Sequence, residues 1–243
     1  MLTLLRKEIT SFFSSLIGYL VIVVFLLATG LFLWVFEGEM NILKSGYAGI
    51  DGLFILAPWI FLFLAPAISM RFFADESKSG TIELLLTMPL TDVSIVLSKY
   101  LAGIILLAIS LLPTLLYLFT AYALGSPPGN LDMGATIGAY IGLFFLGGMY
   151  MAIGTTISAI TDNQIIAFII SAATCFVFFL GFDSIAEILP NTIDKSYLTN
   201  IGIREHYDSI SRGVIDTRDI IYFVSFIGFF LFITTIILAK KRK

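Results

Sequence analysis

The sequence predicts an all-α integral membrane protein with six transmembrane helices. Of its 243 residues, 58% are hydrophobic and only 13% are charged, whereas a soluble domain carries about 25% charged residues. Six stretches contain no Asp, Glu, Lys or Arg, and each reaches the ~18–20 residues that a helix needs to cross ~30 Å of hydrocarbon. These stretches are rich in Leu, Ile and Phe without a two-residue alternation, which disfavours a β-barrel.

The first of these stretches follows Arg6 and Lys7, as the apolar part of a signal peptide would. Its apolar run is too long for one, and no small-residue cleavage site follows Phe36. We therefore interpret it as an uncleaved span. The spans are expected at about residues 17–36, 53–71, 100–124, 134–158, 163–182 and 220–239.

The distribution of basic residues predicts the orientation. Six spans return the chain to the side from which it starts, so that one face holds residues 1–8, 71–99, 159–163 and 240–243. That face carries nine Lys and Arg residues against five on the other face. The excess of positive charge predicts that this face and both termini are cytoplasmic, in a multi-pass protein of the cell inner membrane. The nine residues are Arg6, Lys7, Arg71, Lys78, Lys99, Lys240, Lys241, Arg242 and Lys243.

Residues 1–16 have the spacing of an amphipathic helix. Apolar side chains recur at positions 2, 5, 9, 12, 13 and 16, opposite Thr3, Arg6, Lys7 and Thr10. This pattern predicts an interfacial helix on the cytoplasmic membrane surface, with its basic pair near the lipid headgroups. The alternative is a solvated extension of the first span.

Two further features concern packing. Gly134, Gly138 and Gly142 recur at intervals of four residues, which predicts a contact face for close helix approach. Its partner could be another helix of this chain or a second subunit. Residues 183–219 form the longest stretch outside the spans, on the outer side, with short apolar groups between charges. We expect partial, re-entrant insertion there, because an isolated cap of this size buries too little apolar surface to fold alone.

The spans lack the residues of an ion-coupled carrier or an enzyme. No acid or base lies at the centre of any span, although proton and sodium relays usually depend on such groups. The single cysteine, Cys175, and the single histidine, His206, lack the partners that a nucleophile or a metal centre needs. The chain also contains no GxxxxGK[ST] loop, so that if ATP drives this protein, a separate chain binds it.

The stretch DESKSGTIELLLTMP, residues 75–89, interrupts this apolar pattern. Five charges fall within residues 71–83, and placing each at the centre of a span costs ~2.5–3.5 kcal/mol, so that the segment lies outside the membrane. Thr81 is a candidate N-cap with Glu83 in the first turn, and Pro89 ends the helix. Ile82, Leu85 and Leu86 share one face of this amphipathic helix of two to three turns. The pattern fits an ordinary interfacial helix as well as a docking element.

The surrounding sequence, MRFFADESKSGTIELLLTMPLTDVSIVLSKYLAG, resembles the segment between spans two and three of ABC-2 type transport permeases. The resemblance rests on Arg71, Glu76, Gly80, Thr81, Glu83, Leu84, Leu85, Pro89, Lys99 and Tyr100. The N-terminal RKE, the six spans and the long last outer loop fit the same family. The stretch HYDSISRGVIDTRDIIYF also resembles the sequence before span six in these permeases. More narrowly, the chain resembles the permease subunit associated with gliding motility in Bacteroidetes.

The resemblance implies an exporter-like half-transporter without catalytic activity. Two such permease subunits, identical or paralogous, would pair with two ABC ATPase subunits that bind ATP and Mg; no cofactor in this chain and no nucleic acid is implied. Residues 74–98 would be the cytoplasmic coupling region, and Arg71 could pair with Glu76 to hold its angle. The residues expected to couple to the ATPase are Arg71, Glu76, Gly80, Thr81, Glu83, Leu85 and Pro89.

Two other classes of function compete with this one. A membrane scaffold or anchor for a motility or envelope complex would need a docking helix that looks the same in sequence. A self-contained ion-coupled carrier is disfavoured by the uncharged spans.

Overall fold

The computed structural model describes residues 1–188, 199–213 and 216–242, and within these ranges it is helical with no strand. Six helical stretches are long and apolar enough to cross a membrane, which confirms the predicted all-α class with six transmembrane helices. They are Leu16–Val35, Asp51–Lys78, Asp92–Leu124, Met133–Ile160, Gln164–Ile188 and Thr217–Lys241.

Several of these stretches consist of consecutive helical pieces. The first stretch joins α2 (Leu16–Gly30) and the π-helical turn η1 (Leu31–Val35). The second stretch begins with α3 (Asp51–Ser69). The third joins α6 (Asp92–Leu111), η2 (Leu112–Thr114) and α7 (Leu115–Leu124), and α8 (Met133–Ile160) is the fourth. The fifth joins α9 (Gln164–Phe176), η3 (Val177–Gly181) and α10 (Phe182–Ile188), and α13 (Thr217–Lys241) is the last. The shorter helices are α1 (Leu2–Phe13), α4 (Ala74–Lys78), α5 (Ile82–Thr87) and α12 (Ile203–Ser211).

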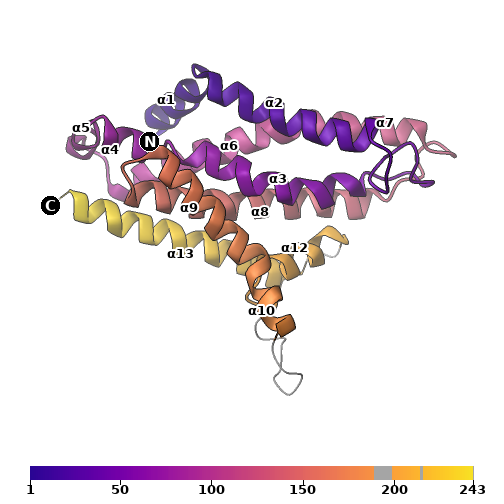
Figure 1. The fold of residues 1–243 in the computed structure, drawn as a ribbon. Coiled ribbons are helices and arrows are strands. Elements are labelled where there is room, and N and C mark those ends of the chain that lie inside the picture. Colours follow the sequence, from indigo (N-terminus) through magenta and orange to yellow (C-terminus); the bar gives the residue numbers. More distant parts are fainter. Residues whose placement is uncertain (189–198, 214–215, 243) are drawn as a thin grey trace.

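Helix α8 is the centre of the bundle, and α3, α6, α9, α12 and α13 pack against it (Figure 1). Its glycines allow this crowding: a Cβ atom at Gly154 would strike the Ser69 hydroxyl of α3, and one at Gly147 would strike Leu107 of α6. In helices α2, α9 and α13 few side chains are buried, and the rest are partly or fully exposed. An apolar helix with an exposed surface is what a lipid-facing position requires.

Helix α12 packs mainly against α8 and reaches α3 through Tyr207. Its buried residues Ile203, Tyr207 and Ile210 recur at helical spacing. The Tyr207 hydroxyl donates a hydrogen bond of 2.7 Å to the carbonyl oxygen of Phe54 in α3. Pro58 has no N–H group to satisfy that carbonyl, so the tyrosine replaces the missing helical hydrogen bond. The sequence expected residues 183–219 to insert partly into the membrane; residues 189–198 and 214–215 lie outside the described residues, and insertion remains a prediction.

The glycine stripe of α8 faces this helix of the same chain. A Cβ atom at Gly138 would lie 3.0 Å from the Gly213 Cα and 3.1 Å from the Ile210 carbonyl oxygen. One at Gly142 would lie 3.1 Å from the Ile210 side chain. Gly134 is exposed, and a Cβ atom there would meet only Asp132, 3.4 Å away. Gly138 and Gly142 therefore pack against α12 and the residues that follow it, whereas Gly134 does not take part in this contact.

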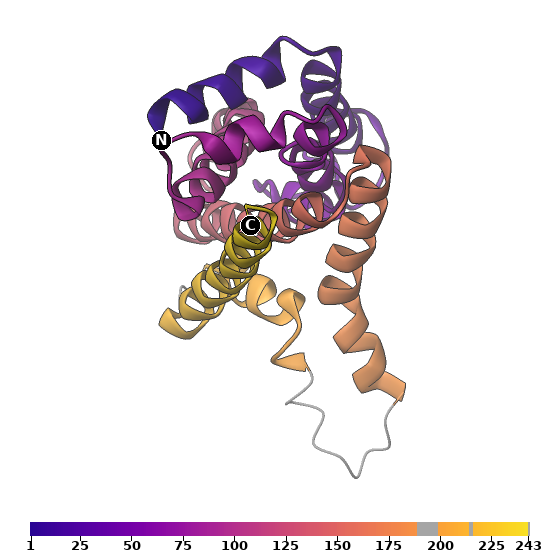
Figure 2. The same cartoon turned by 90° about the vertical axis from the view of Figure 1, so that its left-hand side faces the viewer.

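Helix α1 lies across one end of the bundle (Figure 2). The chain bends between α1 and α2 at Ser14 and Ser15, and the Ser15 side chain caps α2 by accepting a hydrogen bond from the Gly18 N–H. A side chain at Gly18 would collide with the Phe12 carbonyl, so the close approach requires glycine. Both termini, α1, α4 and α5 gather at this end (Figure 1), which is the face that the charge distribution predicts to be cytoplasmic.

We predict that Gly138→Ala lowers the melting temperature of the purified protein. The added methyl group meets backbone atoms that cannot rotate away, and overpacking of this kind costs roughly 1–3 kcal/mol, or a fall of at least about 2 °C for a chain of this size. Gly134→Ala is the matched control and should leave the melting temperature unchanged. Equal melting temperatures for both variants in detergent would contradict the contact with α12.

Candidate functional site

Residues 70–91, here called the docking segment, connect α3 to α6 and contain α4 and α5. The segment lies at the end of the bundle where both termini meet (Figures 1 and 2). One of its sides faces other helices and the other faces away from them.

Lys99 of α6 is the centre of the inward side. Its side chain is only 1% exposed. The Lys99 Nζ lies 2.8 Å from the Glu8 Oε1 of α1 and 3.0 Å from the Glu76 Oε2 of α4. A buried ammonium is strongly destabilising unless it is paired, and here two carboxylates from separate helices pair with it. Lys99 therefore binds α1 and α4 to α6.

A second lysine closes this cluster. The Lys7 Nζ of α1 donates a hydrogen bond of 3.1 Å to the Glu76 Oε1, so each Glu76 oxygen contacts a different lysine. Burial lowers the pKa of Lys7. The hydrogen bond to Glu76 and the negative charges of Glu76 and Glu8 raise it by more, so the pKa of Lys7 lies above its ordinary value. Lys7 therefore stays charged at physiological pH. Helix α1 is linked to the docking segment directly through Lys7 and Glu76, and to α6 through Glu8 and Lys99.

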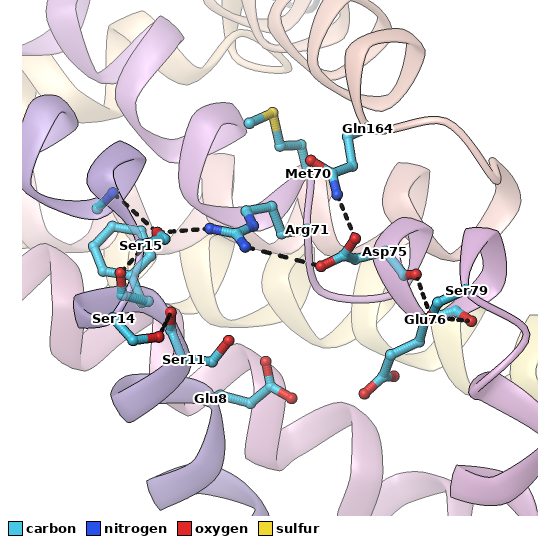
Figure 3. A network of polar contacts seen from close by, with 12 residues as sticks. Glu8, Ser11, Ser14, Ser15, Met70, Arg71, Asp75, Glu76, Ser79 and Gln164 are labelled. Atoms are coloured by element: carbon cyan, nitrogen blue, oxygen red, sulfur yellow. Dashed lines mark hydrogen bonds and ion pairs between the residues drawn. The ribbon is translucent and has the colours of Figure 1, made fainter.

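Arg71 forms a separate group with α2 and α9 (Figure 3). Its guanidinium donates a hydrogen bond of 2.7 Å to the Ser15 hydroxyl at the start of α2. On its other side it lies 3.9 Å from the Asp75 carboxylate, which accepts a hydrogen bond of 2.6 Å from the Gln164 side chain of α9. The segment is thereby joined to the first and fifth spans.

The pairing of Arg71 with Glu76 that the sequence suggested is wrong. Arg71 pairs with Asp75, and Glu76 pairs with Lys7 and Lys99. Residues four apart in a helical turn lie on the same face, whereas residues five apart are separated by about 140°. Glu76 consequently points toward α1 and α6 rather than toward Arg71.

Backbone groups at the turn between α3 and α4 are satisfied by α8. The Ser158 hydroxyl accepts hydrogen bonds from the N–H groups of Phe73, at 3.0 Å, and Ala74, at 3.2 Å. The same hydroxyl donates to the Met70 carbonyl at 3.0 Å. A buried turn would otherwise leave unpaired peptide groups, so one side chain of the central helix fixes this turn.

The end of α13 contacts the docking segment at two positions, Ser77 and Leu90. Lys241 donates a hydrogen bond of 3.3 Å to the Ser77 hydroxyl and lies 3.7 Å from Asp162 in the α8–α9 turn. Arg242 lies 2.8 Å from the Asp92 carboxylate and donates a hydrogen bond of 3.0 Å to the Leu90 carbonyl. The last span thus contributes to the same assembly of contacts.

The outward side of the segment carries most of the residues that the resemblance assigned to coupling. Gly80, Thr81, Glu83 and Pro89 are exposed, and Gly80 turns the chain with a φ of 71°. Leu84 is 66% exposed and Met88 49% exposed. Inward, Leu85 and Leu86 are 3% and 8% exposed, so that α5 is amphipathic as its spacing predicts. The helix has six residues, which is shorter than expected.

The structure divides the predicted coupling residues into two groups. Glu76 and Leu85 are buried and Arg71 is half-buried, whereas the other four are exposed. Thr81 occupies the N-cap position of α5, but its side chain makes no capping hydrogen bond. Glu8, Ser158 and Gln164 are contacts that sequence reasoning missed. The only signal for Glu8 was that it is the sole acidic residue among the first 36.

The groups of this site form ion pairs and hydrogen bonds. No cluster of three or more His, Cys, Asp or Glu side chains placed to hold a metal occurs in the described part of the chain. What the arrangement does is to fix the docking segment to the membrane helices while one face of it stays free.

We predict that Lys99→Met destabilises the protein by about 3–5 kcal/mol, because it leaves two buried carboxylates without their shared cation. Unfolding of the purified protein in detergent measures this. Lys78→Met, in an exposed position of α4, is the control and should change stability little. Adding Glu8→Gln and Glu76→Gln to Lys99→Met should recover part of the loss. If Lys99→Met is as stable as the control, the cluster does not hold the segment.

The comparison with known proteins agrees with this architecture. A family model described as "ABC-2 family transporter protein" matches residues 2–239. No curated protein matches the chain. The matched region contains all the short helices named above and nearly the whole of the six long helical stretches. Membrane domains of this kind are permease components of transporters. The chain belongs to the ABC-2 family of transporter membrane proteins.

Proposed function

We propose that this chain is the permease subunit of an exporter-like ABC-2 transporter, driven by a separate ATPase subunit that docks on the exposed face of α5. The observation that carries this proposal is the two-sided docking segment. Its inward side is bound to six other helices, and its outward side presents exposed residues to a partner.

The inward contacts explain how such a partner would move the membrane helices. An isolated helix of six residues is not stable in water, so that the position of α5 depends on its surroundings. Burial of Leu85 and Leu86 fixes α5 to the bundle, and the Glu76 ion pairs fix the preceding helix α4. A displacement imposed on α5 is therefore passed to α1 and α6 through Glu76, and to α2 and α9 through Arg71 and Asp75.

The outward face has the chemistry of a small protein interface. Leu84 and Met88 are large apolar side chains in exposed positions, and they flank Glu83 and Thr87. Apolar anchors beside a few polar groups are typical of interface centres, where methionine is enriched. Glu83 would pair with a cationic group of the ATPase, and Leu84 would supply apolar contact area.

The orientation follows from the same assignment. The docking end carries both termini and most of the basic residues, which suits the cytoplasmic side of the inner membrane. ATP and Mg would be bound by the ATPase subunit there. A second permease subunit, identical or paralogous, would complete the transporter.

We predict that Glu83→Arg and Leu84→Asp each reduce the permease-dependent ATP turnover of the co-purified complex at least about tenfold, the equivalent of one strong interface contact. The melting temperature of the permease should not change, because both side chains are exposed. Glu39→Arg, at an exposed acidic position in the loop between η1 and α3, should leave turnover unchanged. Unaltered turnover in both docking variants would refute docking on α5.

The competing functions give different results. If inactivating the ATP site of the partner leaves the cellular function intact, the chain is a scaffold. If the chain alone moves a solute in liposomes without ATP, it is a carrier.

We propose gliding motility as the process served, on the narrower resemblance of the chain to the permease subunit associated with gliding motility. Deleting the gene should abolish surface spreading of the host cells, and the wild-type gene should restore it whereas the Glu83→Arg gene should not. Normal spreading of the deletion strain would remove motility from the proposal without affecting the transporter assignment.

A further inference from the structure

A cavity of about 260 Å³ lies behind the docking segment, between α1, the end of α3, α4 and α6. Its lining contains three cations and three carboxylates, together with hydroxyl groups and an apolar part formed by Phe12, Ile68 and Phe72. The charged residues are Lys7, Arg71, Lys99, Glu8, Asp75 and Glu76. The volume is slightly below the ~300–1,000 Å³ of pockets for drug-sized molecules, so that a small polar group fits best.

Arg71 is the lining residue with the most unused hydrogen-bonding capacity. A guanidinium has five N–H donors, and in the described ranges Arg71 makes one hydrogen bond, to Ser15, and the loose contact of 3.9 Å with Asp75. Its side chain is only 23% exposed, and it lines the cavity. A planar guanidinium in such a site suits the oxygens of a phosphate group.

The balance of charge indicates what else the ligand carries. Lys99 and Lys7 are already paired with Glu8 and Glu76. Asp75, in contrast, is 48% exposed and lies at the far side of Arg71. A purely anionic ligand would leave the cavity with excess negative charge beside these three carboxylates. A phosphate joined to an ammonium group would keep the lining balanced, with Arg71 and Asp75 as its two contacts.

The position of the cavity indicates the source of such a group. Ile68 lies in the last turn of α3, and Arg71 comes two residues after Ser69, where that helix ends. Phe12 closes the cavity from α1, the helix predicted to lie on the membrane surface. The apolar and charged parts of the lining thus meet at the level where a phospholipid changes from acyl chain to headgroup.

We propose that this cavity binds the headgroup of a zwitterionic phospholipid, with Arg71 holding the phosphate and Asp75 facing the ammonium. The lipid would fill the space between α1 and the bundle and fix the distance between them. The proposal does not depend on an ATPase partner, since every group involved belongs to this chain.

The test uses the purified permease in detergent, and native mass spectrometry or calorimetry measures its binding of three probes. The probes are short-chain phosphatidylethanolamine, short-chain phosphatidylglycerol and inorganic phosphate. We expect the first to bind best and Arg71→Gln to weaken its binding at least about tenfold, as the loss of a charge-assisted phosphate contact should. Arg6→Gln removes a neighbouring positive charge of α1 that does not line the cavity and should leave binding unchanged.

A second variant tests the ammonium contact and covers the case in which Arg71→Gln does not fold. Asp75→Asn should weaken binding of phosphatidylethanolamine and not that of phosphatidylglycerol. Equal binding of the two lipids by the wild-type protein would overturn the zwitterionic assignment. Binding of inorganic phosphate without lipid would overturn the lipid source, and lipid binding unaffected by Arg71→Gln would overturn the site. These experiments measure lipid binding and not ATP turnover. Their result therefore stands whether or not an ATPase docks on α5.

Discussion

A lysine ammonium almost sealed from solvent determines how the docking end of this bundle is built. Removing such a charge from water costs several kcal/mol, and only close partners offset this cost. Lys99 obtains them from Glu8 in α1 and Glu76 in α4, which are not neighbours in sequence. If either helix moved away, the buried Lys99 ammonium would lose one of its two carboxylate partners. The exposed pair of Lys44 and Glu37 at the other end carries no such penalty and contributes at most about 1 kcal/mol.

This constraint gives α1 a role beyond lying on the membrane. Two adjacent residues of α1, Lys7 and Glu8, belong to the ion-pair cluster that positions the docking segment, so α1 is fixed to the same cluster as that segment. Arg71 is tightly bound to Ser15, but its contact with Asp75 is looser, at 3.9 Å, and both residues line the cavity. The end of the bundle therefore combines closely spaced ion pairs around Lys99 with a more widely spaced ion pair between Arg71 and Asp75.

The sequence predicted what depends on local pattern and missed what depends on distant contacts. Uncharged length predicts the six long helices because hydrocarbon excludes charge, and helical spacing predicts the burial of Leu85 and Leu86. The third span was expected from Tyr100, yet its helix begins at Asp92, since a helix can continue through charges that are paired or lie outside the hydrocarbon. The link from Lys99 to Glu8 joins residues 91 positions apart, and no local pattern identifies it. The same reason explains the mistaken pairing of Arg71, because the choice between Asp75 and Glu76 depends on where α1 and α6 lie.

The prolines of α3 explain why side chains from other helices have to hold the docking segment. Pro58 and Pro66 each remove a backbone hydrogen bond from α3, the helix that leads into the segment. Helix α3 therefore bends more easily at these positions than an uninterrupted helix would. At Pro58 the Tyr207 hydroxyl satisfies the freed Phe54 carbonyl and ties α3 to α12. Pro66 lies one turn before the segment begins. A segment attached only through α3 would therefore swing about that point, and the Glu76 ion pairs, together with the Ser158 hydrogen bonds from α8, restrict this motion.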